Sequence, residues 1–244
     1  MTSVSSAANA PLNTPFAAAR PKGFDWFLTV AVVACIAACV RALFYTPADA
    51  MLGDAQKIFY IHVPAAIVGL YLACGLLAIC SLVYLWIRDE RLDRLAESSA
   101  EVGLVFMGMV LVTGPVWART SWGTWWQWEA RITSTLFLWL VVLGYLVLRN
   151  AVENTEQRAR LSAVMGSLAA LLVPFIHLTV LLFRGMHPPP VVLTPNNPQN
   201  NLPPEMRLTF LFATLAFLLL FFALLRMRYR WAAMRDARAA LEHG

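Results

Sequence analysis

Residues 58–87 read IFYIHVPAAIVGLYLACGLLAICSLVYLWI, and this run decides the fold class of the chain. The run contains no Asp, Glu, Lys or Arg, and as a helix rising about 1.5 Å per residue it would be about 45 Å long. The hydrocarbon core of a bilayer is about 30 Å thick, so about 15 Å of this helix would project from it. If Arg88 marks one interface, His62 and Pro64 lie at or above the opposite interface.

The rest of the chain has the same membrane-protein character. Of its 244 residues, 59% are hydrophobic and 14% are charged, and the mean hydropathy is +0.63. We therefore predict an all-α polytopic membrane protein with six transmembrane helices. The spans are expected near residues 24–44, 58–87, 100–118, 131–149, 161–183 and 208–227. They form one membrane domain over 23–230, between a disordered N-terminal tail at 1–22 and a C-terminal tail at 231–244.

The basic residues indicate the orientation. The two tails and the second and fourth loops carry thirteen of the nineteen lysines and arginines, and the other loops carry six. By the positive-inside rule both termini are cytoplasmic, the first span is a retained signal anchor, and the first, third and fifth loops face outward. Since the arginines mostly end apolar runs, the net charge of +5 indicates topology and no nucleic-acid partner. The four cysteines form no C-x-x-C motif, which argues against a thiol oxidoreductase.

The third loop contains the most unusual segment, SWGTWWQWEARITS at 121–134. Four tryptophans fall within seven positions of it and a fifth precedes it: Trp122, Trp125, Trp126, Trp128 and Trp117. In a helix over 122–129, three of these residues and Glu129 would share one face at the outer membrane boundary. An ordinary aromatic belt would distribute its tryptophans over many helix ends. The cluster therefore predicts a flat aromatic binding platform.

The histidines suggest what this platform binds. A single histidine near a membrane interface is ordinarily a solvated or hydrogen-bonded side chain. His62 and His187, however, flank the platform from separate helical hairpins on the same side, which suits two axial ligands of a haem iron. Zinc would need further ligands, of which the outer loops have few. His177 is expected to bond a carbonyl freed by Pro174, and His243 to have no role.

A haem also carries two carboxylates, which need cations. Lys57 and Arg131 are the favoured partners, because they are nearest in sequence to His62 and to the platform. Arg119 and Arg184 are equally compatible with contacts to lipid phosphate.

These motifs resemble those of a known family. WGTWWQWEARITS resembles the "WWD" signature of haem-handling membrane proteins, and its WGTWW and ARITS parts are most similar to the haem exporter protein C family of cytochrome c maturation. Supporting matches are PAD at 47–49, YIHVPAAI at 60–67 and VTGPVWA at 112–118. The resemblance covers about residues 24–230 and departs at Glu129, where the family usually has aspartate, and at Lys57, where relatives often have arginine.

The resemblance implies a multi-pass protein of the bacterial inner membrane that holds haem b transiently and non-covalently on its periplasmic face. The family's axial ligands correspond to His62 and His187, and its platform to the tryptophans and Glu129. The implied partners are a periplasmic haem chaperone, the ATPase and permease subunits of an ABC transporter, a small single-span subunit and the lipid membrane. The implied role is haem transfer without an enzymatic activity, and a catalytic role in covalent loading of the chaperone stays open.

Two other functions are weighed against this one. A haem lyase would attach haem directly to apocytochrome, but such relatives are larger and often carry a second pair of histidines, which this chain lacks. A haem permease would need a polar pathway, and the predicted spans contain few polar residues.

Overall fold

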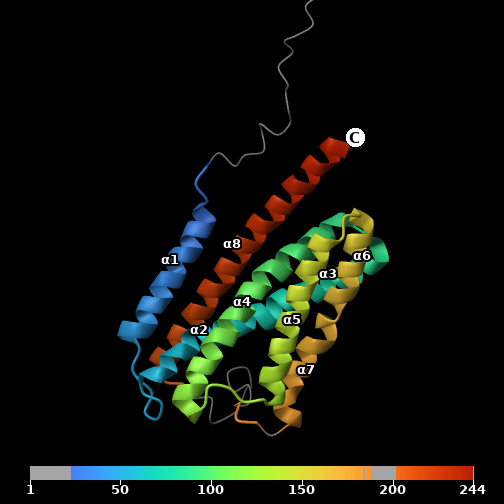
Figure 1. The fold of residues 1–244 in the computed structure, drawn as a ribbon. Coiled ribbons are helices and arrows are strands. Elements are labelled where there is room, and N and C mark those ends of the chain that lie inside the picture. Colours follow the sequence, from blue (N-terminus) through green and yellow to red (C-terminus); the bar gives the residue numbers. More distant parts are fainter. Residues whose placement is uncertain (1–22, 184, 188–201, 244) are drawn as a thin grey trace, which may run out of the picture.

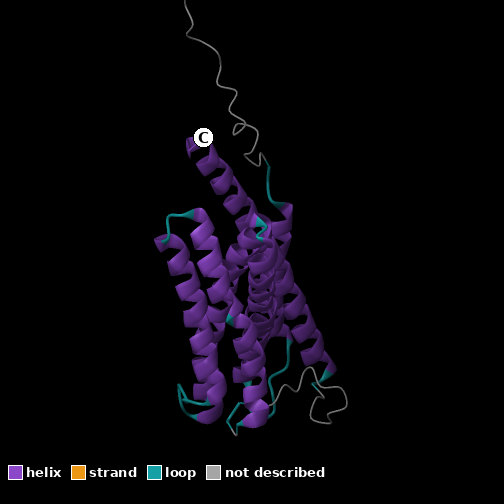
Figure 2. Cartoon of the chain, turned by 90° about the vertical axis from the view of Figure 1, so that its right-hand side faces the viewer, coloured by secondary structure: helices purple, strands orange, loops and turns teal. Residues whose placement is uncertain are grey.

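The structure, a computed structural model, describes residues 23–183, 185–187 and 202–243. Within these residues all regular structure is helical, apart from one isolated bridge between Asp49 and Gly53 (Figure 2). Six helical runs are long and apolar enough to cross a membrane, which confirms the predicted all-α six-span fold. These runs are Trp26–Tyr45, Asp54–Ile87, Glu90–Trp122, Ala130–Ala151, Thr155–Leu182 and Pro204–Glu242.

Several runs are built from more than one helical element. The first is α1 (Trp26–Val40) followed by the π-helical turn η2 (Arg41–Tyr45). The second consists of the 3₁₀ turn η3 (Asp54–Ile58), α2 (Phe59–Ala66), the π-helical η4 (Ile67–Ala73) and α3 (Cys74–Ile87). The remaining helices are α4 (Glu90–Trp122), α5 (Ala130–Ala151), α6 (Thr155–Ser167), α7 (Ala169–Leu182) and α8 (Pro204–His243).

Two helices extend well beyond the spans expected from sequence. α4 begins at Glu90, because the Asp89 side chain accepts a hydrogen bond from the Arg91 backbone N–H at 2.8 Å and caps the helix. α8 is 40 residues long and continues through most of the predicted C-terminal tail. The predicted N-terminal tail at 1–22, and residues 184 and 188–201 of the fifth loop, lie outside the described residues.

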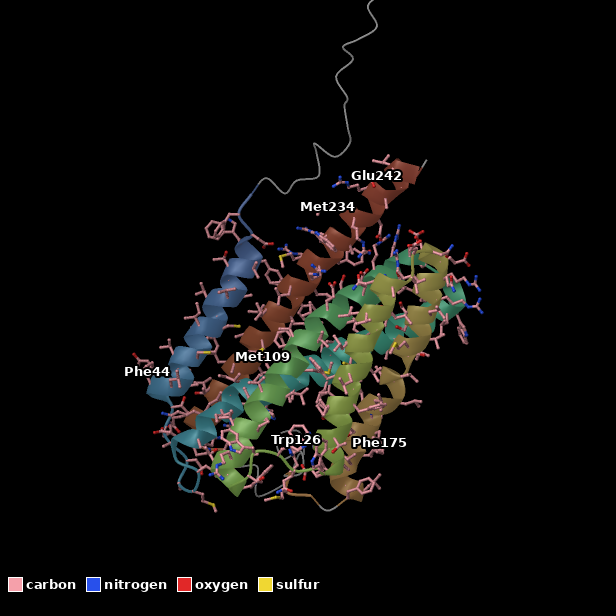
Figure 3. All side chains as sticks on the ribbon, in the orientation of Figure 1. Phe44, Met109, Trp126, Phe175, Met234 and Glu242 are labelled. Atoms are coloured by element: carbon pink, nitrogen blue, oxygen red, sulfur yellow. The ribbon has the colours of Figure 1, made fainter. Side chains whose placement is uncertain are left out.

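The helices form an elongated bundle (Figure 1). α4 packs against α2, η4, α3, α5 and α8, while α1 lies beside α8 at one edge. The start of α1, the α3–α4 turn and the end of α8 lie at one end of the bundle, the terminal end. The connections 46–53 and 123–129 and the start of α8 lie at the other, the tryptophan end. Exposed apolar side chains such as Phe44 and Phe175 point outward from the bundle (Figure 3), as expected for helices that face lipid.

The second run and α4 approach each other almost to backbone contact. A Cβ added at Gly69 would lie 3.0 Å from the Met107 backbone nitrogen, and one added at Gly103 would lie 2.8 Å from Ala73 Cβ. Small residues at a helix crossing permit this approach, which is the usual way in which helices associate in membranes. The crossing packs α2 against the half of α4 that leads to the tryptophan end.

At the terminal end the helices are joined by buried charges. Arg149 of α5 donates to both carboxylate oxygens of Asp93, at 2.6 and 2.9 Å, and to Glu97 at 3.0 Å. Arg235 of α8 donates to Glu97 at 2.6 and 2.9 Å. Both carboxylates belong to α4, so this ion cluster connects α4, α5 and α8. The Arg149 side chain is only 4% exposed.

Removing the central cation of this cluster should destabilise the protein. Arg149→Met leaves Asp93 and Glu97 buried with less compensation, and we expect a loss of about 3–5 kcal/mol in the free energy of unfolding. Thermal unfolding of the protein in detergent measures this change. Arg238→Met is the matched control, because the ion pair of Arg238 with Glu242 is exposed and is worth about 1 kcal/mol or less. Equal melting temperatures for the two variants would contradict the prediction.

Candidate functional site

The tryptophan segment is an irregular connection between two helices. α4 ends at Trp122, because Gly123 adopts a left-handed conformation (φ 77°) and its N–H bonds back to the Arg119 carbonyl at 3.2 Å. α5 begins at Ala130, and the residues between are not helical. The expected helical face over 122–129 was therefore wrong. The sequence contains a helix-ending residue, Gly123, within the segment whose periodic spacing favoured a helix.

The indole rings of this segment point in different directions. Trp126 and Trp128 contact each other edge to face, with 72° between their ring planes, so the predicted platform is not flat. Trp125 and Trp128 are 59% and 76% exposed, whereas Trp117, Trp122 and Trp126 are half-buried. Figure 3 shows Trp126 between the ends of α4 and α5. The segment thus offers both supporting rings and an exposed aromatic surface.

His62 lies on α2 and is buried against α4, with 6% of its surface exposed. Its Nδ1 is 2.9 Å from the Thr113 hydroxyl, and that hydroxyl donates its only hydrogen to the Met109 carbonyl at 2.7 Å. Thr113 must therefore accept the Nδ1 proton of His62, which leaves the lone pair of His62 Nε2 free. A Cβ at Gly114 would come within 3.3 Å of His62 Cε1, so the glycine makes room for the ring.

The second predicted ligand, His187, lies in the short segment Gly185–His187 after α7. Its Nδ1 is 3.3 Å from Glu129 Oε1, and the adjacent Met186 backbone N–H donates to Glu129 Oε2 at 2.8 Å. The pKa of the Glu129 carboxyl lies below its ordinary value, mainly because of its contact with His187 and also because Met186 donates to it, although burial opposes both effects. The carboxylate is therefore ionised near neutral pH.

Each histidine also contacts one tryptophan. The His62 and Trp117 rings are 5.6 Å apart, and the His187 and Trp122 rings are 5.9 Å apart, both edge to face. The His62 imidazole interacts electrostatically with His187 and with Arg131. Residues 62, 131 and 187 therefore lie near enough to interact at the tryptophan end.

The four candidate cations are in different situations. The Lys57 ammonium is 2.7 Å from Asp54 Oδ1 and donates to the Leu43 carbonyl at 2.9 Å. Arg119 is exposed and donates to the Gly123 carbonyl, while Arg184 lies outside the described residues. Arg131 has a buried Nη1 without a hydrogen-bond acceptor. Of the two favoured residues, Arg131 has the greater unused capacity to bind an anion.

His177 makes a different contact from the one expected. Its Nδ1 is 3.2 Å from the Tyr71 hydroxyl, so the recorded partner is a side chain of η4 and not a carbonyl freed by Pro174. Tyr71 also interacts with the Arg131 guanidinium. The sequence did not single out Tyr71, Thr113 or Gly114, although the last two lie in the VTGPVWA motif.

The two histidines suit a metal that is already bound in a macrocycle better than a bare ion. The described residues contain no group of three or more His, Cys, Asp or Glu side chains suited to a bare ion. Two imidazoles with their Nδ1 atoms occupied or faced by oxygen can supply two axial ligands to a planar macrocycle. Three buried donors at this end of the bundle have no acceptor, namely Trp117 Nε1, Trp126 Nε1 and Arg131 Nη1, and Trp117 and Arg131 interact with His62. These are the residue types that a haem iron and its carboxylates require.

The chain is similar to the proteins of a known family. The sequence model of the family described as "Heme exporter protein C" matches residues 7–243. Relatives with the same description include a protein of Paracoccus denitrificans, 37% identical over 223 residues, or 86% of this chain and 88% of the relative. Another is from Bradyrhizobium diazoefficiens, 33% identical over 91% of this chain and 81% of the relative. A third is from Escherichia coli K12, 31% identical over 84% of this chain and 81% of the relative.

The hydrogen bond that orients His62 can be tested without any ligand. Thr113→Val removes the acceptor of the Nδ1 proton and leaves a buried donor unpaired, at a cost of about 1–3 kcal/mol. We expect the ¹⁵N spectrum of labelled histidine to show that His62 has lost its single Nδ1–H tautomer. Thr120→Val is the matched control, since Thr120 also lies on α4 but its hydroxyl bonds only backbone carbonyls. An unchanged His62 spectrum in Thr113→Val would contradict the assignment.

Proposed function

This chain belongs to the haem exporter protein C family, and we propose that it binds haem at its tryptophan end and delivers it to a periplasmic haem chaperone. The family handles haem for cytochrome c maturation and is a component of haem export. In this proposal the protein lies in the bacterial inner membrane with both termini in the cytoplasm, and the haem site is periplasmic. The count of basic residues supports that orientation.

The observation that carries the proposal is the pair of oriented histidines. His62 and His187 are 125 positions apart in sequence and share one site, and each has an oxygen partner near Nδ1. A histidine that ligates a metal through Nε2 typically has its other ring nitrogen engaged in this way. In this proposal the two histidines supply both axial ligands of the haem iron; His62 is already oriented by a hydrogen bond, and His187 faces a carboxylate.

The tryptophans would hold the ring and also leave it accessible. Trp117 and Trp122 support the two imidazoles, whereas Trp125 and Trp128 present large exposed indole surfaces. Aromatic rings provide the apolar contact that a macrocycle needs. A site at the tryptophan end of the bundle, with exposed indoles beside it, suits a cargo that must leave for a second protein.

Arg131 is the better candidate for a haem carboxylate. Its Nη1 is buried without an acceptor, and binding a carboxylate there would satisfy it. Lys57 would first have to leave Asp54 and the Leu43 carbonyl. We therefore assign the main propionate contact to Arg131 and a lesser one to Lys57.

A transfer role fits the histidine inventory better than a lyase role. The chain has four histidines, and of the two besides the proposed ligands, His177 bonds Tyr71 and His243 lies at the end of α8. No second ligand pair is therefore available for another haem. In the proposed role the protein holds and presents haem, and the partners are an ABC ATPase and permease, a small single-span subunit and the haem chaperone.

The axial assignment is tested by spectroscopy of the purified protein. The wild-type protein loaded with haem should give the low-spin spectrum of two histidine ligands, and His62→Ala with His187→Ala should abolish it. Each single variant should give a five-coordinate or mixed species. His243→Ala serves as the control and should keep the wild-type spectrum. A double variant with the wild-type spectrum and haem content would rule out this site.

The propionate assignment is tested with an ester of the ligand. Haem dimethyl ester lacks both carboxylates, so the wild-type protein should bind it about tenfold or more weakly than haem, which corresponds to about 1.4 kcal/mol. In Arg131→Gln this difference should largely disappear, and in Lys57→Gln it should persist. Titrations followed by absorbance measure the affinities. Retention of the full difference in Arg131→Gln would refute the assignment.

A further inference from the structure

Glu129 makes contacts that the proposed haem site does not by itself explain. Each oxygen of its carboxylate faces a different residue of the segment that carries His187. Oε2 accepts the Met186 backbone N–H at 2.8 Å, and Oε1 is 3.3 Å from His187 Nδ1. The two partners are 57 and 58 positions away in sequence, so one side chain connects the third loop to the fifth.

The contact is close and largely shielded from water. The Glu129 side chain is 12% exposed, and a Cβ built at Gly185 would come within 2.4 Å of Glu129 Oε2. Any residue other than glycine would therefore have to displace the carboxylate or the segment. The sequence FRGMHPPP thus has its glycine at the point where the chain passes over Glu129.

The two proposed ligands are held in different ways. His62 is part of α2, and its Nδ1 partner Thr113 is part of α4, so both belong to the helical bundle. His187 lies outside any helix, and its described contacts are with Glu129 and with the Trp122 ring. Among the described residues, His187 is therefore connected to the tryptophan segment through Glu129 and Trp122.

We propose that Glu129 is a positioning residue for His187: its carboxylate fixes the segment Gly185–His187 and directs Nε2 of the imidazole toward the site shared with His62. The inference rests on the proposed haem site. The carboxylate accepts the Nδ1 proton after a small rotation of the ring, because the present contact lacks the alignment of a regular hydrogen bond. A carboxylate partner also makes the imidazole a stronger electron donor to a metal than a neutral partner does.

This role accounts for a carboxylate at this position. Glutamine would keep the acceptor for the Met186 N–H but would lose the negative charge facing His187. Aspartate would keep the charge and shorten the reach by one methylene. Alanine would remove both contacts. The three substitutions therefore separate anchoring of the segment from the electronic effect on the ligand.

The experiment uses the full-length protein in detergent, loaded with haem, and adds free imidazole as a probe. Glu129→Ala should lose about 10- to 100-fold in haem affinity and shift to a high-spin species, because His187 no longer reaches the iron. Free imidazole should restore the low-spin spectrum, as it should in His187→Gly.

Glu129→Gln should stay low-spin with a higher reduction potential, and Glu129→Asp should resemble the wild-type protein more closely than either. Glu205→Gln, which changes an exposed carboxylate at the start of α8, is the control.

A second measurement needs no ligand. Hydrogen exchange at the Met186 amide of the haem-free protein should be at least about tenfold faster in Glu129→Ala than in the wild-type protein, because its acceptor is gone. Wild-type affinity, spin state and amide exchange in Glu129→Ala would overturn the positioning role while leaving the histidine assignment intact. If the wild-type protein itself shows no bis-histidine spectrum, the proposed function fails first, and the exchange measurement still decides whether Glu129 anchors the segment.

Discussion

The close approach of α4 to the run α2–η4 is the contact on which the rest of the structure depends. Gly69 and Gly103 let the two backbones meet near Met107 and Ala73. Farther along α4, Thr113 receives the His62 proton and Gly114 leaves room for the ring. The same crossing therefore packs the centre of the bundle and orients the first ligand. A bulkier residue at Gly69 or Gly103 would separate the helices and move His62 away from its partner.

The two ends of the bundle differ in how their cations are paired. At the terminal end, Arg149 and Arg235 are paired with carboxylates of α4, so their charges are compensated within the protein, although the Nε atom of Arg149 is buried without an acceptor. At the tryptophan end, indole and guanidinium donors are buried without acceptors. Unpaired buried donors cost free energy in the absence of a partner. The ion cluster therefore links α4, α5 and α8 at the terminal end, whereas the unpaired donors of Trp117 and Arg131 at the tryptophan end belong to residues that interact with His62.

Much of this architecture could be predicted from the sequence, because membrane thickness constrains apolar runs so strongly. The runs around 58–87 and 131–149 became helices close to their expected bounds. The start of α4 was not predicted, because residues 90–99 contain many charges and hydropathy detects only apolar runs. This part of the helix is stabilised by its cap and by buried ion pairs. The histidines could be predicted to share one side of the membrane, but Tyr71, Thr113 and the geometry of Glu129 could not. Those contacts depend on helix crossings, and a periodic pattern carries no information about which helices cross.

Because of its length, α8 reaches both ends of the bundle. After Pro204 it contains neither glycine nor proline over its remaining length, so it has no residue suited to act as a hinge. Near one end its Arg235 joins the buried ion cluster, and near the other its Phe210 ring lies 5.1 Å from Phe59, which in turn contacts Trp117. α8 is thus one continuous helix, with one end in the ion cluster and the other beside Trp117, which contacts His62. One helix therefore takes part both in the ion cluster and in the aromatic contacts beside His62.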